Sequence, residues 1–279
     1  MTQRDMHGTV CLVTGSSSGL GKATALGLAK LGATVILGCR DKERGESALA
    51  EIKAASGQEA LELLLIDLSV QQSVREMAAE FKQKYPRLDV LINNAAVFKQ
   101  RRVLAVDGIE TMFATNHLGP FLLTNLLLER LQASPSGCIL TITAPSTTTL
   151  DFDDLHGEKQ FNALHAFGAS KTCNLLFTFE LARRLAGTDV TALAIHPGLV
   201  KSKLMREAAA PIRWITSLLS TSPEKAAKAV VHYASSPDVA GLSGRFVKGR
   251  KIIEASPYAQ DQAVQKRLWE VSMTLTHLA

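Results

Sequence analysis

A chain of 279 residues suits one large α/β domain, and a composition of 46% hydrophobic and 20% charged residues excludes a disordered or fibrous protein. The net charge is only +5 and the basic residues are dispersed, so we expect a solvated surface without nucleic acid, with an anionic small ligand left open. The cysteines form no C-x-x-C pair, no apolar run approaches a membrane span, and the polar N-terminus leads straight into a strand, so we expect a cytoplasmic protein with no span and no signal peptide.

Apolar segments with strand character alternate with helical segments along the whole chain. In chain order we predict a strand at 10–13, a helix at 20–32, a strand at 34–40, a helix at 41–56, a strand at 61–69, a helix at 73–86, a strand at 88–96, a helical region at 109–132, a strand at 138–144, a helix at 167–187, a strand at 190–198 and a helix at 223–236. This alternation predicts a Rossmann-like α/β fold, a doubly wound parallel sheet with helices on both faces. Because no repeat or linker interrupts it, we predict a single domain over 1–279.

The turn between the first strand and the first helix is rich in glycine and serine. Glycines keep such a turn tight and let backbone N–H groups approach a pyrophosphate, which the helix N-terminus also favours. The spacing is G-x-x-x-G-x-G, and its place in an N-terminal strand–turn–helix unit supports a dinucleotide site. The candidate residues are Gly15, Ser17, Ser18, Gly19, Leu20 and Gly21.

Arg40 lies at the end of the second predicted strand. An acid at this place typically binds the ribose 2′-hydroxyl of NAD, whereas an arginine accommodates the 2′-phosphate of NADP. Arg40 therefore favours NADP(H), while the neighbouring Asp41 keeps NAD(H) as the lesser alternative.

These segments and several later ones resemble the short-chain dehydrogenase/reductase family, in its retinol-dehydrogenase-like or carbonyl-reductase-like branch. The motifs that carry the resemblance are TGSSSGLG at 14–21, ILGCRD at 36–41, IDLS at 66–69, LINNAA at 91–96, TNHLGPFLLT at 115–124, GASK at 168–171, LARRL at 181–185 and HPGLV at 196–200. The resemblance implies that Asp67 and Leu68 border the adenine and that Asn94 and Ala95 support the cofactor. It also implies that the nicotinamide is held by Lys171, at its ribose, and by Pro197, Gly198 and Val200.

The family mechanism uses an asparagine, a serine, a tyrosine and a lysine. Asn116 and Lys171 match two of these positions, but Ala144 stands where the resemblance places the serine and Phe167 where it places the tyrosine. Neither side chain has a hydroxyl, so neither can donate a proton. The surrounding sequence, TITAPSTTT, also departs from the family pattern, which favours a natural divergence over a designed double substitution.

Other hydroxyls near the serine position are candidate substitutes. Thr143 directly precedes Ala144, and Ser146 follows two residues later. His165 is a further titratable group near Phe167, although a surface or loop-packing histidine is the favoured interpretation. His117 and His196 flank matched motifs and are expected to be structural.

The segment Pro211 to Leu219 is amphipathic and belongs to a predicted substrate lid around 200–222. We expect an NADP(H)-dependent oxidoreductase that acts on a small hydrophobic carbonyl, imine or alcohol by an atypical mechanism, with an enzyme as the favoured outcome. A catalytically inactive NADP(H)-binding sensor or partner subunit remains open, as does a non-redox isomerase or cyclase. We expect no metal, and a homodimer or homotetramer is possible for such a domain.

Overall fold

An eight-stranded sheet forms the centre of the molecule, with strand order β3-β2-β1-β4-β5-β6-β7-β8. The computed structural model describes residues 5–202, 204–208, 214 and 220–278. All strand pairs are parallel except the last, where β8 runs antiparallel to β7. The strands are β1 Val10–Thr14, β2 Thr34–Cys39, β3 Leu61–Leu65, β4 Val90–Asn93, β5 Cys138–Ile142, β6 Thr191–His196, β7 Phe246–Lys248 and β8 Lys251–Ile253.

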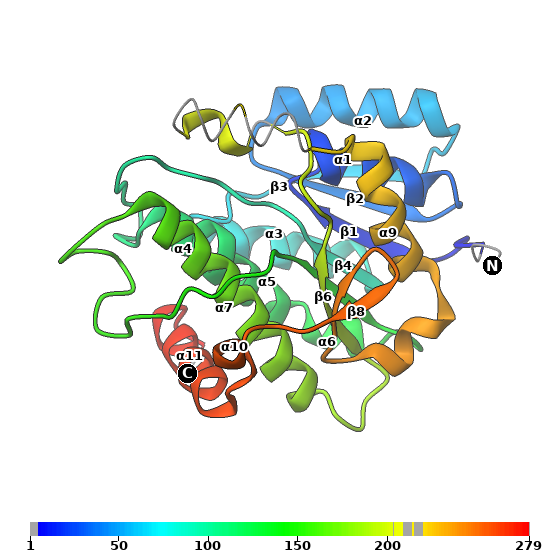
Figure 1. The fold of residues 1–279 in the computed structure, drawn as a ribbon. Helices are drawn as coiled ribbons and strands as arrows, with labels where there is room; N and C mark the ends of the chain where they lie inside the picture. Colours follow the sequence, from blue (N-terminus) through cyan, green and yellow to red (C-terminus); the bar gives the residue numbers. More distant parts are fainter. Residues whose placement is uncertain (1–4, 203, 209–213, 215–219, 279) are drawn as a thin grey trace.

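Helices cover both faces of this sheet (Figure 1). They are α1 Gly19–Ala29, α2 Lys42–Ser56, α3 Gln71–Lys84, α4 Thr111–Phe113, the π-helical turn η1 Ala114–Leu118, α5 Gly119–Leu126, α6 Leu128–Gln132, α7 Ala163–Arg184, the 3₁₀ turns η2 Leu204–Glu207 and η3 Pro237–Leu242, α9 Pro223–Ser235, α10 Pro257–Gln260 and α11 Gln262–Leu275. Buried residues of α1, α2 and α9 share one cluster with one face of the sheet, and those of α3, α5 and α7 share another with the opposite face. No helix in the described ranges is both long and apolar enough to cross a membrane.

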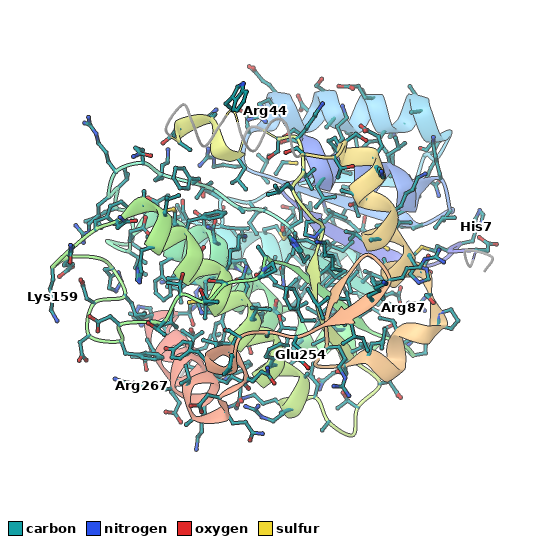
Figure 2. The ribbon with its side chains drawn as sticks, in the orientation of Figure 1. His7, Arg44, Arg87, Lys159, Glu254 and Arg267 are labelled. Atoms are coloured by element: carbon teal, nitrogen blue, oxygen red, sulfur yellow. The ribbon has the colours of Figure 1, made fainter. Side chains whose placement is uncertain are left out.

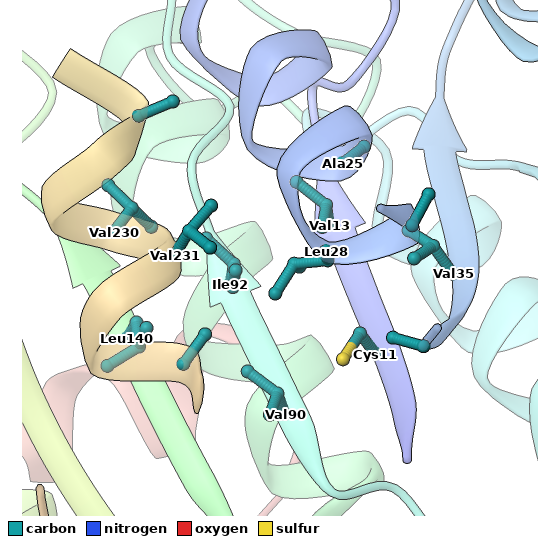
Figure 3. Packing of buried hydrophobic residues seen from close by; sticks show 14 of the residues in the cluster. Cys11, Val13, Ala25, Leu28, Val35, Val90, Ile92, Leu140, Val230 and Val231 are labelled. Atoms are coloured by element: carbon teal, nitrogen blue, oxygen red, sulfur yellow. The ribbon is translucent and has the colours of Figure 1, made fainter. Parts of the chain in front are cut away.

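The first cluster shows how the sheet is covered (Figure 3). Leu28 of α1 and Val230 of α9 are fully buried above the β1 and β4 side chains Val13 and Ile92. Gly27 lets the two helices approach, because a Cβ there would lie 2.6 Å from Val231 of α9. Burial of such side chains contributes about 1.5–3 kcal/mol each.

The strand order reverses between β1 and β4. From β1 the sheet runs through β2 to β3 on one side and through β4 to β8 on the other. In open α/β sheets, ligands bind outside the carboxyl ends of the strands at such a reversal. At the carboxyl ends of β1 and β4 we therefore expect a binding crevice.

The predicted fold class, a doubly wound α/β sheet, is confirmed, but several predicted boundaries are wrong. The strands predicted at 61–69, 88–96 and 138–144 are shorter, because pairing with their neighbours ends where the chain turns toward the crevice. The helix predicted to begin at Phe167 begins at Ala163, where the Asn162 side chain caps it by accepting a bond from the His165 N–H. The strands β7 and β8 and the helices α10 and α11 were not predicted.

The helix predicted over 109–132 is interrupted. It consists of α4, η1, α5 and α6, and Asn116 lies in the middle of the π-helical turn. Pro120 contributes to the interruption, since it has no N–H to donate to the carbonyl of Asn116 four residues earlier. Single π-helical turns of this kind occur frequently at functional sites.

His117, next to Asn116, anchors the C-terminal helix. Its Nε2 lies 2.8 Å from the Ser272 Oγ of α11, and rings of Phe113, Phe121 and Phe177 surround the imidazole. Its Nδ1 is buried without a hydrogen-bond partner among the described residues. Burial lowers the pKa of His117 from 6.5 to about 3, so the ring is neutral in the folded protein.

Acid should therefore destabilise the fold through this residue. Below pH 6.5 the unfolded chain binds a proton on the imidazole and the folded chain does not, so stability falls by about 1.4 kcal/mol per pH unit until the folded pKa is reached. Between pH 7 and pH 5, we expect wild type to lose about 2 kcal/mol of unfolding free energy beyond the loss of His117→Gln. Urea titrations at both pH values test this, with the exposed-site variant His165→Gln as control. Equal losses in wild type and His117→Gln would contradict it.

Candidate active site

The turn after β1 has the geometry of an anion cradle. Gly15 has a φ of +66°, and a Cβ on it would lie 2.8 Å from the Cα of Ala95. A Cβ on Gly21 would lie 2.5 Å from Asn94 Nδ2. Ser17 is half-buried, Ser18 is exposed, Leu20 is buried, and Gly19 also has a positive φ, so the predicted residues of the turn lie together. The tight backbone is consistent with the predicted phosphate contact.

The N-terminus of α1 is free of side-chain capping. Ser18 is its N-cap residue but makes no side-chain cap bond, and the first turn holds no acidic residue. Among the other helices of eight or more residues, α2, α7, α9 and α11 have side-chain caps, whereas α3 and α5 do not. The first N–H groups of α1 are thus left for an anion, which the helix dipole also favours.

Thr14 and Asn94 join the ends of β1 and β4. The Thr14 Oγ1 accepts bonds from the N–H groups of Asn94 at 3.0 Å and Ala95 at 3.2 Å, and donates to Ile92 O. The Asn94 side chain donates in turn to the Thr14 carbonyl at 2.7 Å. These bonds fix the floor of the crevice beside the turn.

Two arginines lie at the end of β2. The Arg40 side chain is 65% exposed and its Nη1 is 3.8 Å from Asp67 Oδ2, while Ser69 bonds the other carboxylate oxygen. Arg44, at the start of α2 (Figure 2), donates from Nη2 to the Ser18 hydroxyl at 3.4 Å. Asp41 accepts a bond from the Arg44 N–H as the N-cap of α2. The Arg40 guanidinium is thus held by Asp67 after β3, and the Arg44 guanidinium by Ser18 in the turn after β1.

Leu68 is buried close to the start of α5. A Cβ on Gly119 would lie 2.2 Å from the Leu68 carbonyl, so only glycine allows this approach. At the other end of the crevice, Pro197 and Gly198 follow β6 and are half-buried. Val200 forms a bridge to Thr221, which closes the base of the predicted lid.

The side chain of Asn116 is completely engaged. Its Oδ1 accepts the Val97 N–H at 2.8 Å, and its Nδ2 donates to Val97 O at 3.0 Å and to Ser170 Oγ at 3.1 Å. The Ser170 hydroxyl in turn donates a hydrogen bond to the carbonyl oxygen of Phe167 at 2.7 Å. The amide therefore joins the loop after β4 to the first turns of α7.

The hydroxyls of Thr143 and Ser146 both bond to α7. Thr143 Oγ1 is buried and donates to Lys171 O at 2.9 Å, and Ser146 Oγ donates to Gly168 O at 2.9 Å. Because a hydroxyl has one proton, each has used its donor on the helix backbone. Ala144, between them, is half-buried at the end of β5. In this structure the two predicted substitute donors thus hold α7 in place through hydrogen bonds to its backbone.

Lys171 and Phe167 lie one turn apart on the same side of α7. The Lys171 Nζ is 5.3 Å from the centroid of the Phe167 ring, and the residue is only 7% exposed. Burial lowers the pKa of Lys171 to about 8. A cation near an aromatic face gains some stabilisation, but the ring does not offer it a hydrogen-bond acceptor.

An apolar cluster surrounds the Phe167 ring. Phe98 meets it edge-on with the centroids 5.7 Å apart, and Met112, Phe161, Leu204 and Ala208 belong to the same cluster. Above this cluster, Lys99 Nζ forms an ion pair of 2.9 Å with Glu207 of η2. Trp214 is exposed, whereas the rest of the predicted lid helix at 211–219 lies outside the described residues.

Sequence reasoning missed four residues of this site. Arg44 lies in the first turn of α2, four residues after Arg40, and this closeness in sequence could have indicated it. Ser170 and the Lys99–Glu207 pair form contacts across long sequence distances, which no local pattern announces. His165 is exposed, and His196 at the end of β6 has a buried Nδ1 without a partner in the described part of the chain.

Comparison with known proteins agrees with this geometry. The short chain dehydrogenase family matches residues 9–212. The chain belongs to this family. It is 40% identical over 294 residues to retinol dehydrogenase 14 of Homo sapiens, which covers 98% of this chain and 88% of that protein, and 38% identical to human retinol dehydrogenase 13 over 97% and 85%.

Solved structures share the fold of this family member. A crystal structure of a protein from Mycobacterium paratuberculosis has a TM-score of 0.79 at 34% identity and covers 99% of this chain and 96% of that one. A short chain dehydrogenase from Escherichia coli CFT073, described as complexed with NADPH, has a TM-score of 0.71 at 23% identity, over 90% and 100% of the two chains. Membership of the short chain dehydrogenase family and the Rossmann-like fold are thus both established.

The turn at Gly15 offers a test that separates strain from collision. Gly15→Ala places a Cβ in a left-handed backbone and against Ala95, whereas Gly57→Ala has a similar φ, +70°, with nothing within 4 Å. We expect Gly57→Ala to lose about 1–2 kcal/mol of unfolding free energy, and Gly15→Ala to lose about 1–3 kcal/mol more. Chemical denaturation measures both. Equal losses would show that the β1–β4 approach is looser than the structure indicates.

Proposed function

We propose that this protein is an NADP(H)-dependent oxidoreductase that interconverts a hydrophobic carbonyl or imine and its reduced form. The observation that carries the proposal is the meeting of three features at one crevice: the uncapped α1 turn, the paired arginines, and the Asn116–Lys171 end of the site. The cofactor supplies or accepts the hydride when it is bound. The chain's own groups bind, orient and exclude water.

The charge at the crevice mouth supports NADP(H) over NAD(H). Arg40 and Arg44 are both exposed, and guanidinium groups bind phosphate well. Asp41, the acid that would favour NAD(H), has a carboxylate already used as the cap of α2. Similar folds described as complexed with NADP or NADPH point in the same direction.

An apolar substrate is supported by what surrounds Phe167. The cluster around it contains phenylalanine, methionine and leucine side chains from the loop after β4, from α4, from α7 and from the segment after β6. The Lys99–Glu207 ion pair joins residues that directly neighbour Phe98 and Ala208 of this cluster. Relatives named retinol dehydrogenase suggest an isoprenoid alcohol or aldehyde as the first substrate to test.

A cofactor-binding protein without turnover is the second candidate. Phe167 and Ala144 have no hydroxyls, and the protons of Thr143 and Ser146 are bonded to α7. This leaves the site without the hydroxyl donor that its family members use. A sensor or partner subunit would need the same nucleotide crevice but no proton donor.

The cofactor preference can be tested by binding alone. An arginine–phosphate hydrogen bond is worth about 1.5–3 kcal/mol, so Arg40→Ala and Arg44→Ala should each weaken NADPH about 10- to 150-fold and change NADH much less. Fluorescence titration gives the Kd values. Lys42→Ala is the matched control, since Lys42 is a comparably exposed cation between the two arginines. Equal affinity of wild type for NADPH and NADH would refute the NADP preference.

Restoring hydroxyls separates the two candidate functions. Ala144→Ser with Phe167→Tyr should raise NADPH-dependent reduction of decanal and all-trans-retinaldehyde by about 10²- to 10⁴-fold, because general acid catalysis contributes that much. Phe167→Tyr alone should recover part of this gain and Ala144→Ser alone little. Phe121→Tyr controls for an added hydroxyl, because Phe121 is a buried aromatic residue in the cluster shared by α3, α5 and α7. A double variant that folds and binds NADPH yet stays inert would favour the sensing or non-redox role.

A further inference from the structure

Among the residues that the structure describes, none forms a hydrogen bond with the ammonium group of Lys171, whereas the nearby hydroxyls are all bonded. Thr143, Ser146 and Ser170 each give their one proton to a carbonyl of α7. An ammonium group has three protons, so Lys171 can bond a ribose hydroxyl and still donate to a second oxygen. We propose that Lys171 itself donates the proton to the substrate oxygen, an inference that rests on the proposed oxidoreductase function.

The geometry gives the ammonium group access to that oxygen. Lys171 lies one turn after Phe167, with Nζ 5.3 Å from the ring centroid. Thr143 fixes the helix backbone at the lysine, and the Asn116–Ser170 bond fixes the preceding residue. Since Phe167 lacks the hydroxyl of a tyrosine, the substrate oxygen or one bridging water can take the place beside Nζ.

The electrostatics suit an acid that works near neutral pH. Burial is the cause that lowers the pKa of Lys171 to about 8, and a donor is most effective when its pKa is near the working pH. The ionisable groups on the elements packed around this end of α7 are Glu110, His117, His196 and Tyr258, and none of them contributes to this shift. The helix α11 contacts the opposite end of α7, where the neutral Gln265 accepts a hydrogen bond from Arg183.

The proposed step is balanced. The carbonyl carbon receives a hydride from a reduced nicotinamide, which is oxidised, and the carbonyl π bond breaks toward oxygen. One N–H bond of Lys171 breaks as an O–H bond forms on the substrate, which leaves a neutral amine and an alcohol. Water then returns a proton to the amine.

Single-turnover reduction of decanal by enzyme loaded with NADPH tests the step. From pH 6 to 10, we expect a constant rate below about pH 8 and a tenfold fall per unit above it. Lys171→Arg keeps a cation for the ribose but cannot release its proton, so it should bind NADPH within about tenfold of wild type. It should lose about 10²- to 10⁴-fold in the hydride-transfer rate. Lys171→Met, which removes the charge, is the second variant, and Lys266→Arg on α11 is the control.

A measurement without turnover checks the same group. In protein labelled with ¹⁵N-lysine, the Nζ resonance that disappears in Lys171→Arg should titrate near pH 8 in the absence of substrate. In the Phe167→Tyr background the tyrosine hydroxyl can donate the proton. There, adding Lys171→Arg should reduce the hydride-transfer rate by a factor at least ten times smaller than it does in the wild-type background.

The outcomes distinguish this inference from the function on which it rests. An unchanged rate in Lys171→Arg, or an Nζ titration near 10.5, overturns the lysine as donor. NADPH binding with turnover only in Phe167→Tyr also overturns it, while leaving the cofactor site intact. Failure of wild type to bind NADPH overturns the proposed function itself.

Discussion

The contact between the carboxyl ends of β1 and β4 is the constraint on which the site depends. Thr14 and Asn94 bond each other's backbones, and Gly15 and Gly21 allow the approach because neither carries a Cβ. The turn, the uncapped α1 and the loop leading to Asn116 all begin at this contact. A widening of a few tenths of an ångström would move the glycine-rich turn relative to α7, so the glycines set the position of this turn and of the loop leading to Asn116 together.

The sheet and its order of elements could be predicted because strand and helix periods alternate without interruption. The positions of the glycine-rich turn and of Arg40 could be predicted for the same reason, since each follows a strand directly. The break in the helix around Asn116 was missed because the segment still reads as one helix, and only Gly119 and Pro120 mark the interruption. The strands β7 and β8 have three residues each, too few for a period to be read.

The fate of the hydroxyls shows what sequence could not decide. Thr143 and Ser146 were reasonable substitutes for a missing donor when judged by distance along the chain. Their donor protons instead bond Lys171 O and Gly168 O, and this follows from how closely α7 packs on the end of β5. The position of a hydroxyl along a strand can be read from the local sequence. The acceptor to which it donates depends on the packing of α7, which is distant in sequence.

The π-helical turn at Ala114–Leu118 sets the direction in which the side chains of the following helix point. A π-turn closes its hydrogen bond over one residue more than an α-turn does. Removing one residue there would restore a regular helix but rotate all later side chains by about 100° about the axis. The aromatic face that Phe121 presents to α11 would then point elsewhere, and the amide of Asn116 would leave Val97. The length of this short segment is therefore as specific a part of the sequence as the residues in it, and any graft or chimera must preserve it.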